Sequence, residues 1–311
     1  MSLPQYAHPE ALVDTQWVVA HLSDPKVRLV EADMTPQVYE AGHIPGAVFW
    51  NATDLLLSDQ RTNFDPVAME ELLARSGITN DTTVIAYGDH PAAGAWIFWL
   101  LKVFGHRDVR VLNGGRQKWI AEGRPLTTEP PIITPSIYHA QAPDTSLRAE
   151  REYVQESIGQ TDRVLVDVRT AQEYNGEWFF TGPPEGTERA GHIPGAVHID
   201  CELALNDDGT FKPIDALESL YKGKGITPDK EAIAYCAIGG RSGHTWFVLK
   251  YLLGYPKVRN YDGSWNEWSR HPAMPIEKRS NCCLLVVCYK YKRVFFYKQS
   301  TTNNQPKRIF E

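Results

Sequence analysis

With 311 residues, 42% of them hydrophobic, the chain is long enough for two domains, and its net charge of −6 argues against nucleic acid as a partner. No stretch reaches the ~18 apolar residues of a membrane-spanning helix, and the first residues do not resemble a secretory signal. Because five cysteines in so long a chain do not make a disulfide framework, we expect reduced thiols and a cytoplasmic location.

Short apolar runs alternate with longer helical patterns along the chain. Strands are predicted, in chain order, at Arg28–Glu31, Val84–Tyr87, Val164–Val168 and Ala232–Tyr235. Helices are predicted at Pro66–Gly77, Ala95–Phe104, Pro213–Gly223 and Gly243–Leu253. Strands that alternate with helices indicate an α/β fold in which parallel sheets are flanked by helices.

The chain also repeats itself. The octapeptide AGHIPGAV occurs at Ala41–Val48 and recurs 149 residues later at Ala190–Val197. The run at Val84–Tyr87 recurs 148 residues later at Ala232–Tyr235. Beyond this strand the spacing between matching residues is 149 again, because Gly254 matches the glycine at position 105. We therefore expect two homologous domains, of which the second gains one residue after its matching strand.

The boundaries follow from the repeat. Residues 1–126 hold the first copy and residues 148–277 the second, and the proline-rich residues 127–147 read as an extended linker. Residues 278–311 form a basic tail without a counterpart in the first copy. Its apolar, β-prone segments could add an edge strand or aggregate. Its three cysteines fit no zinc spacing, so no metal is expected there.

One cysteine occupies a position that favours chemistry. Cys236 directly follows the predicted strand Ala232–Tyr235, where the first copy has Gly88. In open α/β sheets ligands collect at the carboxyl ends of strands. A loop that leads into a helix presents N–H groups and the positive end of the helix dipole, and both favour a thiolate. Gly239 and Gly240 let such a loop curl tightly.

The rest of the loop supplies groups for an anionic substrate. Arg241 brings a permanent positive charge and a planar donor fork that suits an oxyanion. Ser242 can cap the following helix and offer its hydroxyl to the sulfur. Ala237 and Ile238 complete the loop, so we count them with the substrate-binding residues.

Residues outside the loop leave alternatives open. Arg169 follows the strand Val164–Val168 and either contributes to the anion site or forms a buried ion pair with Asp167 or Glu173. Residues 175–188 are absent from the first copy. This insert could close over the site or seal the contact between the domains.

Residues that recur in both copies are expected to be structural, since only one copy has the cysteine. His43 and His192 are predicted to stabilise turns, and Trp119 and Trp268 to lie in the two cores. Cys201 is predicted to be buried and unreactive.

These motifs resemble the rhodanese family. The resemblance is carried by HIPGA after a Gly-His pair, by VDVR at Val166–Arg169, by the cysteine loop, and by NYDGSWNEW at Asn260–Trp268. Two copies with the cysteine only in the second resemble the tandem-domain sulfurtransferases. The loop CAIGGRSG is more similar to that of thiosulfate sulfurtransferases than to that of the 3-mercaptopyruvate branch. Many relatives have a basic residue directly after the cysteine, where this chain has Ala237.

The resemblance implies two homologous rhodanese-like domains and a thiosulfate:cyanide sulfurtransferase. Cys236 would take the outer sulfur of thiosulfate as a persulfide and pass it to cyanide or a thiol acceptor, without a cofactor. A 3-mercaptopyruvate sulfurtransferase is the first alternative. A non-catalytic persulfide carrier and a cysteine phosphatase are the others, although phosphatase loops are usually one residue longer between Cys and Arg. Small-molecule substrates are expected, with neither nucleic acid nor membrane as a partner, and the sequence is compatible with a monomer.

Overall fold

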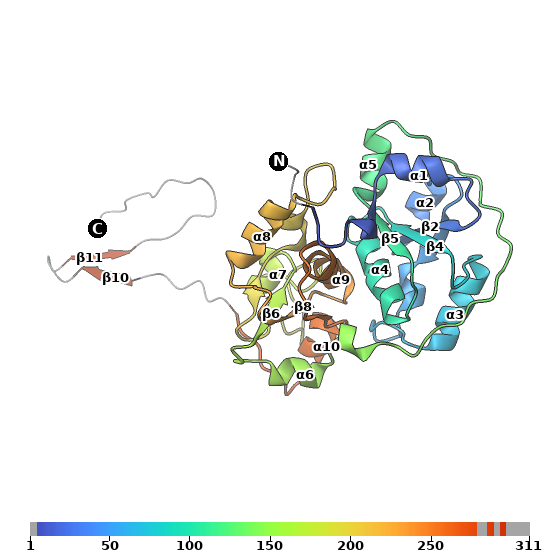
Figure 1. Cartoon of the computed structure of the whole chain (residues 1–311). Helices are drawn as coiled ribbons and strands as arrows, with labels where there is room; N and C mark the ends of the chain where they lie inside the picture. Colours follow the sequence, from blue (N-terminus) through green and yellow to red (C-terminus); the bar gives the residue numbers. More distant parts are fainter. Residues whose placement is uncertain (1–4, 279–284, 289–292, 297–311) are drawn as a thin grey trace.

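Two parallel β-sheets, one from each half of the chain, organise the structure. The computed structural model describes residues 5–278, 285–288 and 293–296. Two α/β domains lie side by side, and a pair of short strands stands apart from them (Figure 1). Each sheet has a buried apolar core on both of its faces, as the alternation of strands and helices predicted.

The strands of each sheet pair in parallel. The first sheet has the order β1-β5-β4-β2-β3 and consists of β1 (Leu12–Val13), β2 (Val27–Asp33), β3 (Val48–Asn51), β4 (Thr83–Tyr87) and β5 (Val109–Leu112). The second has the order β7-β6-β8-β9 and consists of β6 (Arg163–Asp167), β7 (Val197–His198), β8 (Glu231–Tyr235) and β9 (Val258–Asn260). The four predicted strands are confirmed as β2, β4, β6 and β8, and each contains a continuous run of buried residues, as strands covered on both faces do.

Helices connect the strands. The α-helices of the first domain are α1 (Thr15–His21), α2 (Gln37–Ala41), α3 (Pro66–Arg75), α4 (Ala93–Val103) and α5 (Gly115–Ala121). Those of the second are α6 (Arg151–Glu156), α7 (Ala171–Asn175), α8 (Ile214–Lys222), α9 (Gly240–Phe247) and α10 (Ser264–Arg270). Short 3-10 turns occur at η1 (Pro9–Ala11), η2 (Ala52–Leu55), η3 (Thr145–Leu147) and η4 (Cys201–Ala204), and α9 continues as a π-helix, η5 (Val248–Leu252).

The predicted helices are confirmed as α3, α4, α8 and α9. Helix α3 begins as its sequence indicates, because the Asp65 side chain accepts a hydrogen bond from the Val67 N–H at 3.0 Å and Pro66 occupies the first helical position. Helices α4 and α9 begin two and three residues earlier than predicted, at Ala93 and Gly240.

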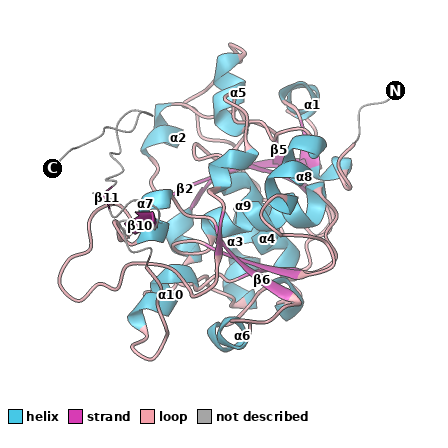
Figure 2. Cartoon of the chain, turned by 90° about the vertical axis from the view of Figure 1, so that its left-hand side faces the viewer, coloured by secondary structure: helices cyan, strands magenta, loops and turns pink. Residues whose placement is uncertain are grey.

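Helices α4 and α9 form the centre of the contact between the domains (Figures 1 and 2). Gly243 of α9 permits the close approach, since a Cβ atom there would lie 3.2 Å from the Cα of Trp96 in α4. Beside this crossing, the rings of Phe98 and Phe247 pack edge to face with centroids 4.8 Å apart. Each helix is covered by its own sheet on one side and by the other domain on the other. This double burial explains why both sequences are apolar on most sides.

The linker and the tail differ in outcome. Residues 128–144 contain no helix or strand, and they lie along the first domain, where the Ser136 N–H donates to the Ala74 carbonyl oxygen and Tyr138 packs on His106. In the tail, β10 (Leu285–Cys288) and β11 (Arg293–Phe296) pair with each other in antiparallel fashion. Of the two possibilities for the tail, an added edge strand is not what its described residues show, since β10 and β11 pair with neither domain sheet. Cys282 and Cys283 lie outside the described residues. None of the helices in the described part of the chain has the length and apolar content that crossing a bilayer requires.

Candidate active site

Cys236 lies at the carboxyl end of β8, where the chain turns into α9. The residue is 1% exposed. It belongs to the same apolar core as Val166 in the neighbouring strand β6 and Val168, which directly follows that strand. The backbone is fixed from below by α10, whose Trp265 N–H donates to the Cys236 carbonyl oxygen at 3.0 Å. The cysteine is therefore held at the edge of the sheet where the sequence placed it.

Two hydrogen-bond donors contact the sulfur atom, and a second hydroxyl lies nearby. The Gly239 N–H donates to Cys236 Sγ with an N···S distance of 3.1 Å. The Ser242 hydroxyl lies 3.5 Å from the same atom, whereas the Ser264 hydroxyl, 3.9 Å away, donates its hydrogen to the Tyr261 carbonyl oxygen at 2.7 Å. All of these groups are buried. Donors without competing water favour a negatively charged sulfur, either a thiolate or a persulfide.

The curl of the loop depends on one glycine. Gly239 has φ +96°, in the left-handed region, and a Cβ atom there would lie 2.8 Å from the backbone oxygen of Asp262. Gly240 has no such requirement, since its added Cβ would meet nothing within 4 Å. Gly239 is also the N-cap residue of α9, so the prediction that Ser242 caps the helix was wrong. Ser242 instead lies in the first turn and directs its hydroxyl at the Gly239 carbonyl and at the sulfur.

Ser264 was missed in the sequence analysis. It is fully buried at the start of α10, and its Oγ accepts a hydrogen bond from the Cys236 N–H at 3.0 Å. Its φ of +51° is unusual for a residue other than glycine, and in the first domain the matching residue is Gly115, with φ +52°. A comparison of the two copies could have identified this residue. At a backbone position that favours glycine, the first copy has glycine, and the copy with the cysteine has serine instead.

Arg241 is held by a carboxylate. Its two terminal nitrogens donate to the two oxygens of Glu173 in α7, both at 2.8 Å, and its side chain is 24% exposed. Burial raises the pKa of Glu173, but the hydrogen bonds and charge of Arg241 outweigh it, so the pKa lies below its ordinary value. The loop cation is therefore rigid and largely neutralised, with an outer part that solvent reaches.

Arg169 lies away from the sulfur. It is fully buried in an ion pair with Asp167, with an Nη2···Oδ2 distance of 2.6 Å, and stacks over the Trp265 ring. Trp265 belongs to the core on the opposite face of the sheet from Cys236. Of the two roles that the sequence left open, the structure shows the ion pair. The partner is Asp167, because Glu173 pairs with Arg241.

The remaining loop residues contribute mainly through the backbone. Ala237 is buried, and its carbonyl oxygen accepts the N–H of Asn266 at 2.9 Å, while Ile238 is half-buried. Cys201 is 3% exposed, and burial raises the pKa of its thiol, which agrees with an unreactive side chain. His244 in α9 is fully buried, and burial lowers its pKa to about 3, so its imidazole is neutral.

The recurring residues are structural, as predicted. His43 and His192 are buried and stack on Tyr39 and Tyr174 with ring centroids 3.8 Å apart in each case. The recurring tryptophans are fully buried and donate through Nε1 to the backbone oxygens of Pro125 and Pro275. In the insert, Phe179 packs into the second domain's own core, so the insert seals a core within that domain.

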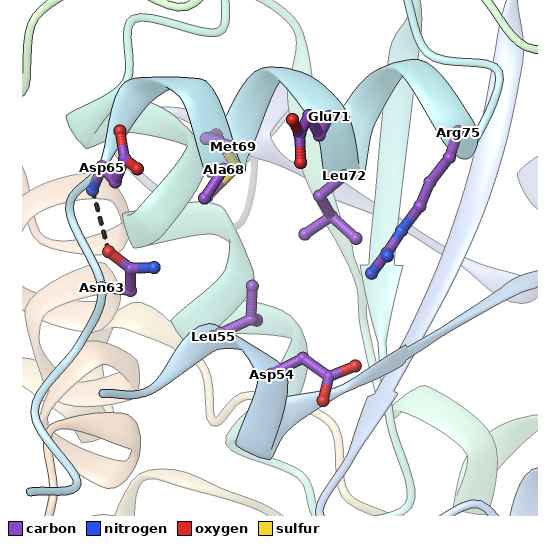
Figure 3. Close-up of a pocket in the computed structure, with 9 residues that line it drawn as sticks. All are labelled: Asp54, Leu55, Asn63, Asp65, Ala68, Met69, Glu71, Leu72 and Arg75. Atoms are coloured by element: carbon purple, nitrogen blue, oxygen red, sulfur yellow. Dashed lines mark hydrogen bonds between the residues drawn. The ribbon is translucent and has the colours of Figure 1, made fainter. Parts of the chain in front are cut away.

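Two hollows are present on the described surface. One, of about 470 Å³, lies between the domains, where Asp89, His90 and Gln117 face Glu202 and residues 205–207 and 209. The other, of about 200 Å³, is formed by α3 and η2 within the first domain (Figure 3). None of residues 236–242 lines either hollow. Within the described residues no group of three His, Cys, Asp or Glu side chains is arranged to hold a metal ion.

Comparison with known proteins gives a consistent result for the sequence. A family model described as "Rhodanese-like domain" matches residues 14–122 and 150–271. The sulfur carrier protein TtuD of Thermus thermophilus is 50% identical over 289 residues, which cover 88% of this chain and 98% of that protein. A protein of Mycolicibacterium smegmatis, provisionally named a thiosulfate sulfurtransferase, is 44% identical over 87% of this chain and 99% of its own length.

Solved structures show the same likeness in three dimensions. A variant of the enzyme EanB, with a cysteine persulfide and ergothioneine, matches with a TM-score of 0.80 and 28% identity, covering 88% of this chain and 72% of that one. The anaerobic ergothioneine biosynthesis enzyme of Chlorobium limicola, in complex with trimethyl histidine, matches with a TM-score of 0.78 over similar shares.

Proposed function

The chain belongs to the rhodanese-like family of sulfurtransferases, and on that premise we propose that it transfers the outer sulfur of thiosulfate to a thiophilic acceptor through Cys236. The observation that carries the proposal is the 3.1 Å contact from the Gly239 N–H to Cys236 Sγ. This contact, with the Ser242 hydroxyl, stabilises a charged sulfur in a buried site at the start of a helix.

The reaction proceeds in two displacements. In the first, the Cys236 thiolate attacks the outer sulfur of thiosulfate; a sulfur–sulfur bond to the cysteine forms, and the bond to the inner sulfur breaks with release of sulfite. In the second, cyanide or a thiolate attacks the persulfide sulfur, and the cysteine thiolate leaves. The Gly239 N–H and the Ser242 hydroxyl support the charge on Sγ in both steps, and neither step needs a cofactor.

In this proposal Arg241 assists donor binding through its exposed side. Its two terminal nitrogens bind Glu173, so the exposed side of the guanidinium group is fixed in place. The positive end of the α9 dipole supplies the remaining attraction for the anion. Gly239, Gly240, Ala237 and Ile238 contribute the backbone of the donor site.

The test is thiocyanate formation from thiosulfate and cyanide. Cys236→Ser is expected to abolish it while the thermal unfolding temperature stays near that of wild type, whereas Cys201→Ser is expected to retain it. Retained activity in Cys236→Ser would sink the proposal. Hydrolysis of an aryl phosphate without thiocyanate formation would favour the cysteine phosphatase, and preference for 3-mercaptopyruvate as donor would move the chain to that branch.

A second candidate, a sulfur carrier, is favoured by the 50% identity to a protein of that name. A carrier would form the persulfide on Cys236 and release it only to a partner protein, so cyanide and small thiols would discharge it slowly. Persulfide formation in a single turnover without multiple turnovers to small acceptors distinguishes this candidate from the enzyme.

A further inference from the structure

A buried asparagine lies beneath the loop that carries Cys236. Asn260 ends β9 and is fully buried. Its Nδ2 donates to the carbonyl oxygen of Gly239 at 3.1 Å, whereas its Oδ1 has no hydrogen-bond partner within the described residues. A buried amide oxygen without a partner lowers stability, so the presence of this side chain calls for an explanation.

The first domain shows that the fold does not need the amide. The matching residue is Val111, which is buried and pairs with Ala86 in the sheet as Asn260 pairs with Ala234. The same place in the repeat thus accepts an apolar side chain in the copy that has Gly88 instead of the cysteine. The amide therefore accompanies the chemistry rather than the fold.

Three donors reach the Gly239 carbonyl oxygen. The Gly243 N–H lies at 3.0 Å, and Asn260 Nδ2 and Ser242 Oγ both lie at 3.1 Å. A carbonyl oxygen has two lone pairs, and a serine hydroxyl has one hydrogen to give. The other acceptor for the Ser242 hydrogen is Cys236 Sγ at 3.5 Å. Because the Gly243 N–H and the Asn260 amide occupy the two lone pairs of the Gly239 carbonyl oxygen, the Ser242 hydrogen is available to the Cys236 sulfur.

We propose that Asn260 is a positioning residue for sulfur transfer. It holds the Gly239 carbonyl and thereby directs the Ser242 hydroxyl onto the Cys236 sulfur. The inference rests on the proposed function, because these hydrogen bonds affect turnover only when the sulfur carries charge. When the amide is lost, Ser242 turns its hydrogen to the carbonyl, and the sulfur loses a donor.

The experiment uses the full chain with Asn260→Val, the side chain of the first domain, and Asn260→Leu, which is close to asparagine in size. We expect the alkylation of Cys236 by iodoacetamide, followed by peptide mass spectrometry, to slow about five- to tenfold, the effect of one lost hydrogen bond. The kcat for thiosulfate falls by a similar factor, and KM stays unchanged, because donor binding does not involve the amide.

Two comparisons separate positioning from a loss of stability. Val111→Ala opens a void at the matching place of the first domain, so it should lower the unfolding temperature and leave the alkylation rate unchanged. In Ser242→Ala, a further Asn260→Val change should have much less effect than it has in wild type, because the amide acts through that hydroxyl.

The contradicting results are equally specific. An alkylation rate that stays at the wild-type value, or rises as a loosened fold exposes the thiol, overturns the role of Asn260. Additive effects in the double variant also overturn it. If wild type itself gains no sulfur from thiosulfate, the proposed function fails instead, and the alkylation series still reports on Asn260 separately.

Discussion

The loops that follow β4 and β8 occupy the same place in the two domains and differ in what their surroundings allow. After β8, Cys236 has room for its side chain and donors around its sulfur. After β4, Gly88 is closed in: a Cβ atom there would lie 2.4 Å from the Ala32 backbone oxygen and 2.6 Å from the Ala93 Cβ. The first domain therefore lacks the space for a nucleophile as well as the residue itself.

The buried charges beside the two loops are also arranged differently. In the second domain, Arg169 follows β6 and lies over the Trp265 ring. In the first, the position of Arg169 is taken by Asp33, and the arginine comes from the helix as Arg116, which replaces the tryptophan and pairs with Glu31. Both domains thus have a buried ion pair near the carboxyl ends of their strands. Only the second domain has, in addition, hydrogen-bond donors that contact a cysteine sulfur.

The largest effect is expected from breaking the ion pair at the cysteine loop. Arg241→Ala leaves Glu173 buried without its partner, so the free energy of unfolding should fall by about 3 kcal/mol. If Arg241 assists the donor, KM for thiosulfate should rise about tenfold. Urea unfolding and steady-state kinetics measure the two quantities.

Arg116→Ala is the matched control, because it breaks the corresponding pair with Glu31 in the first domain. A similar loss of stability with an unchanged KM is expected. Equal changes of KM in the two variants would show that Arg241 has only a structural role.

A medium effect is expected at the two residues with φ near +50°. Ser264→Gly relieves the backbone but removes the acceptor of the Cys236 N–H, so kcat should fall about fivefold with little change in stability. Gly115→Ser introduces the strain into the first domain, so the free energy of unfolding should fall by about 1 kcal/mol at unchanged kcat. If the two substitutions had the same effect on kcat, the comparison between the loops would be wrong.

The smallest effect concerns the pH dependence of stability. Burial, helped by the nearby Asp33, raises the pKa of Glu31 to about 7 against an ordinary value of 4.5. Between these values the unfolded chain binds fewer protons than the folded one. The contribution of Glu31 is therefore complete below the ordinary pKa and is lost as pH rises through about 7.

Glu173 should act in the opposite sense, since its lowered pKa gives a contribution that is present above 4.5 and lost as the pH falls.

Because the stabilisation by Glu31 is lost as the pH rises, Glu31→Gln should flatten the decline of the free energy of unfolding between about pH 5 and about pH 8. Urea titrations at the two pH values measure it. A decline as steep as that of wild type would contradict the assignment.

Local patterns predicted much of this structure. The strands and buried helices follow from apolar runs, and Cys236 and Gly239 follow from the repeat and from the turn into a helix. The choice of Ser242 as the cap failed because the left-handed conformation of Gly239 fixes where α9 begins.

Contacts between segments distant in the chain could not be predicted from the sequence. Ser264 lies 28 residues after the cysteine and meets it only because α10 packs under the end of β8. Glu173 was considered as a partner of Arg169, but it pairs with Arg241, because α7 and the start of α9 come together only in the folded domain. Side chains that act across strands are identified by geometry rather than by spacing.

We expect sulfur transfer to take place in the second loop alone, on the sulfur atom of Cys236. The most direct measurement is mass spectrometry of the intact chain and of its peptides after brief exposure to thiosulfate and removal of the excess. Transfer through Cys236 predicts the mass of one added sulfur atom, located on the peptide that contains Cys236 and absent from Cys236→Ser. An unmodified Cys236 peptide, or an added sulfur on Cys201 instead, would contradict it.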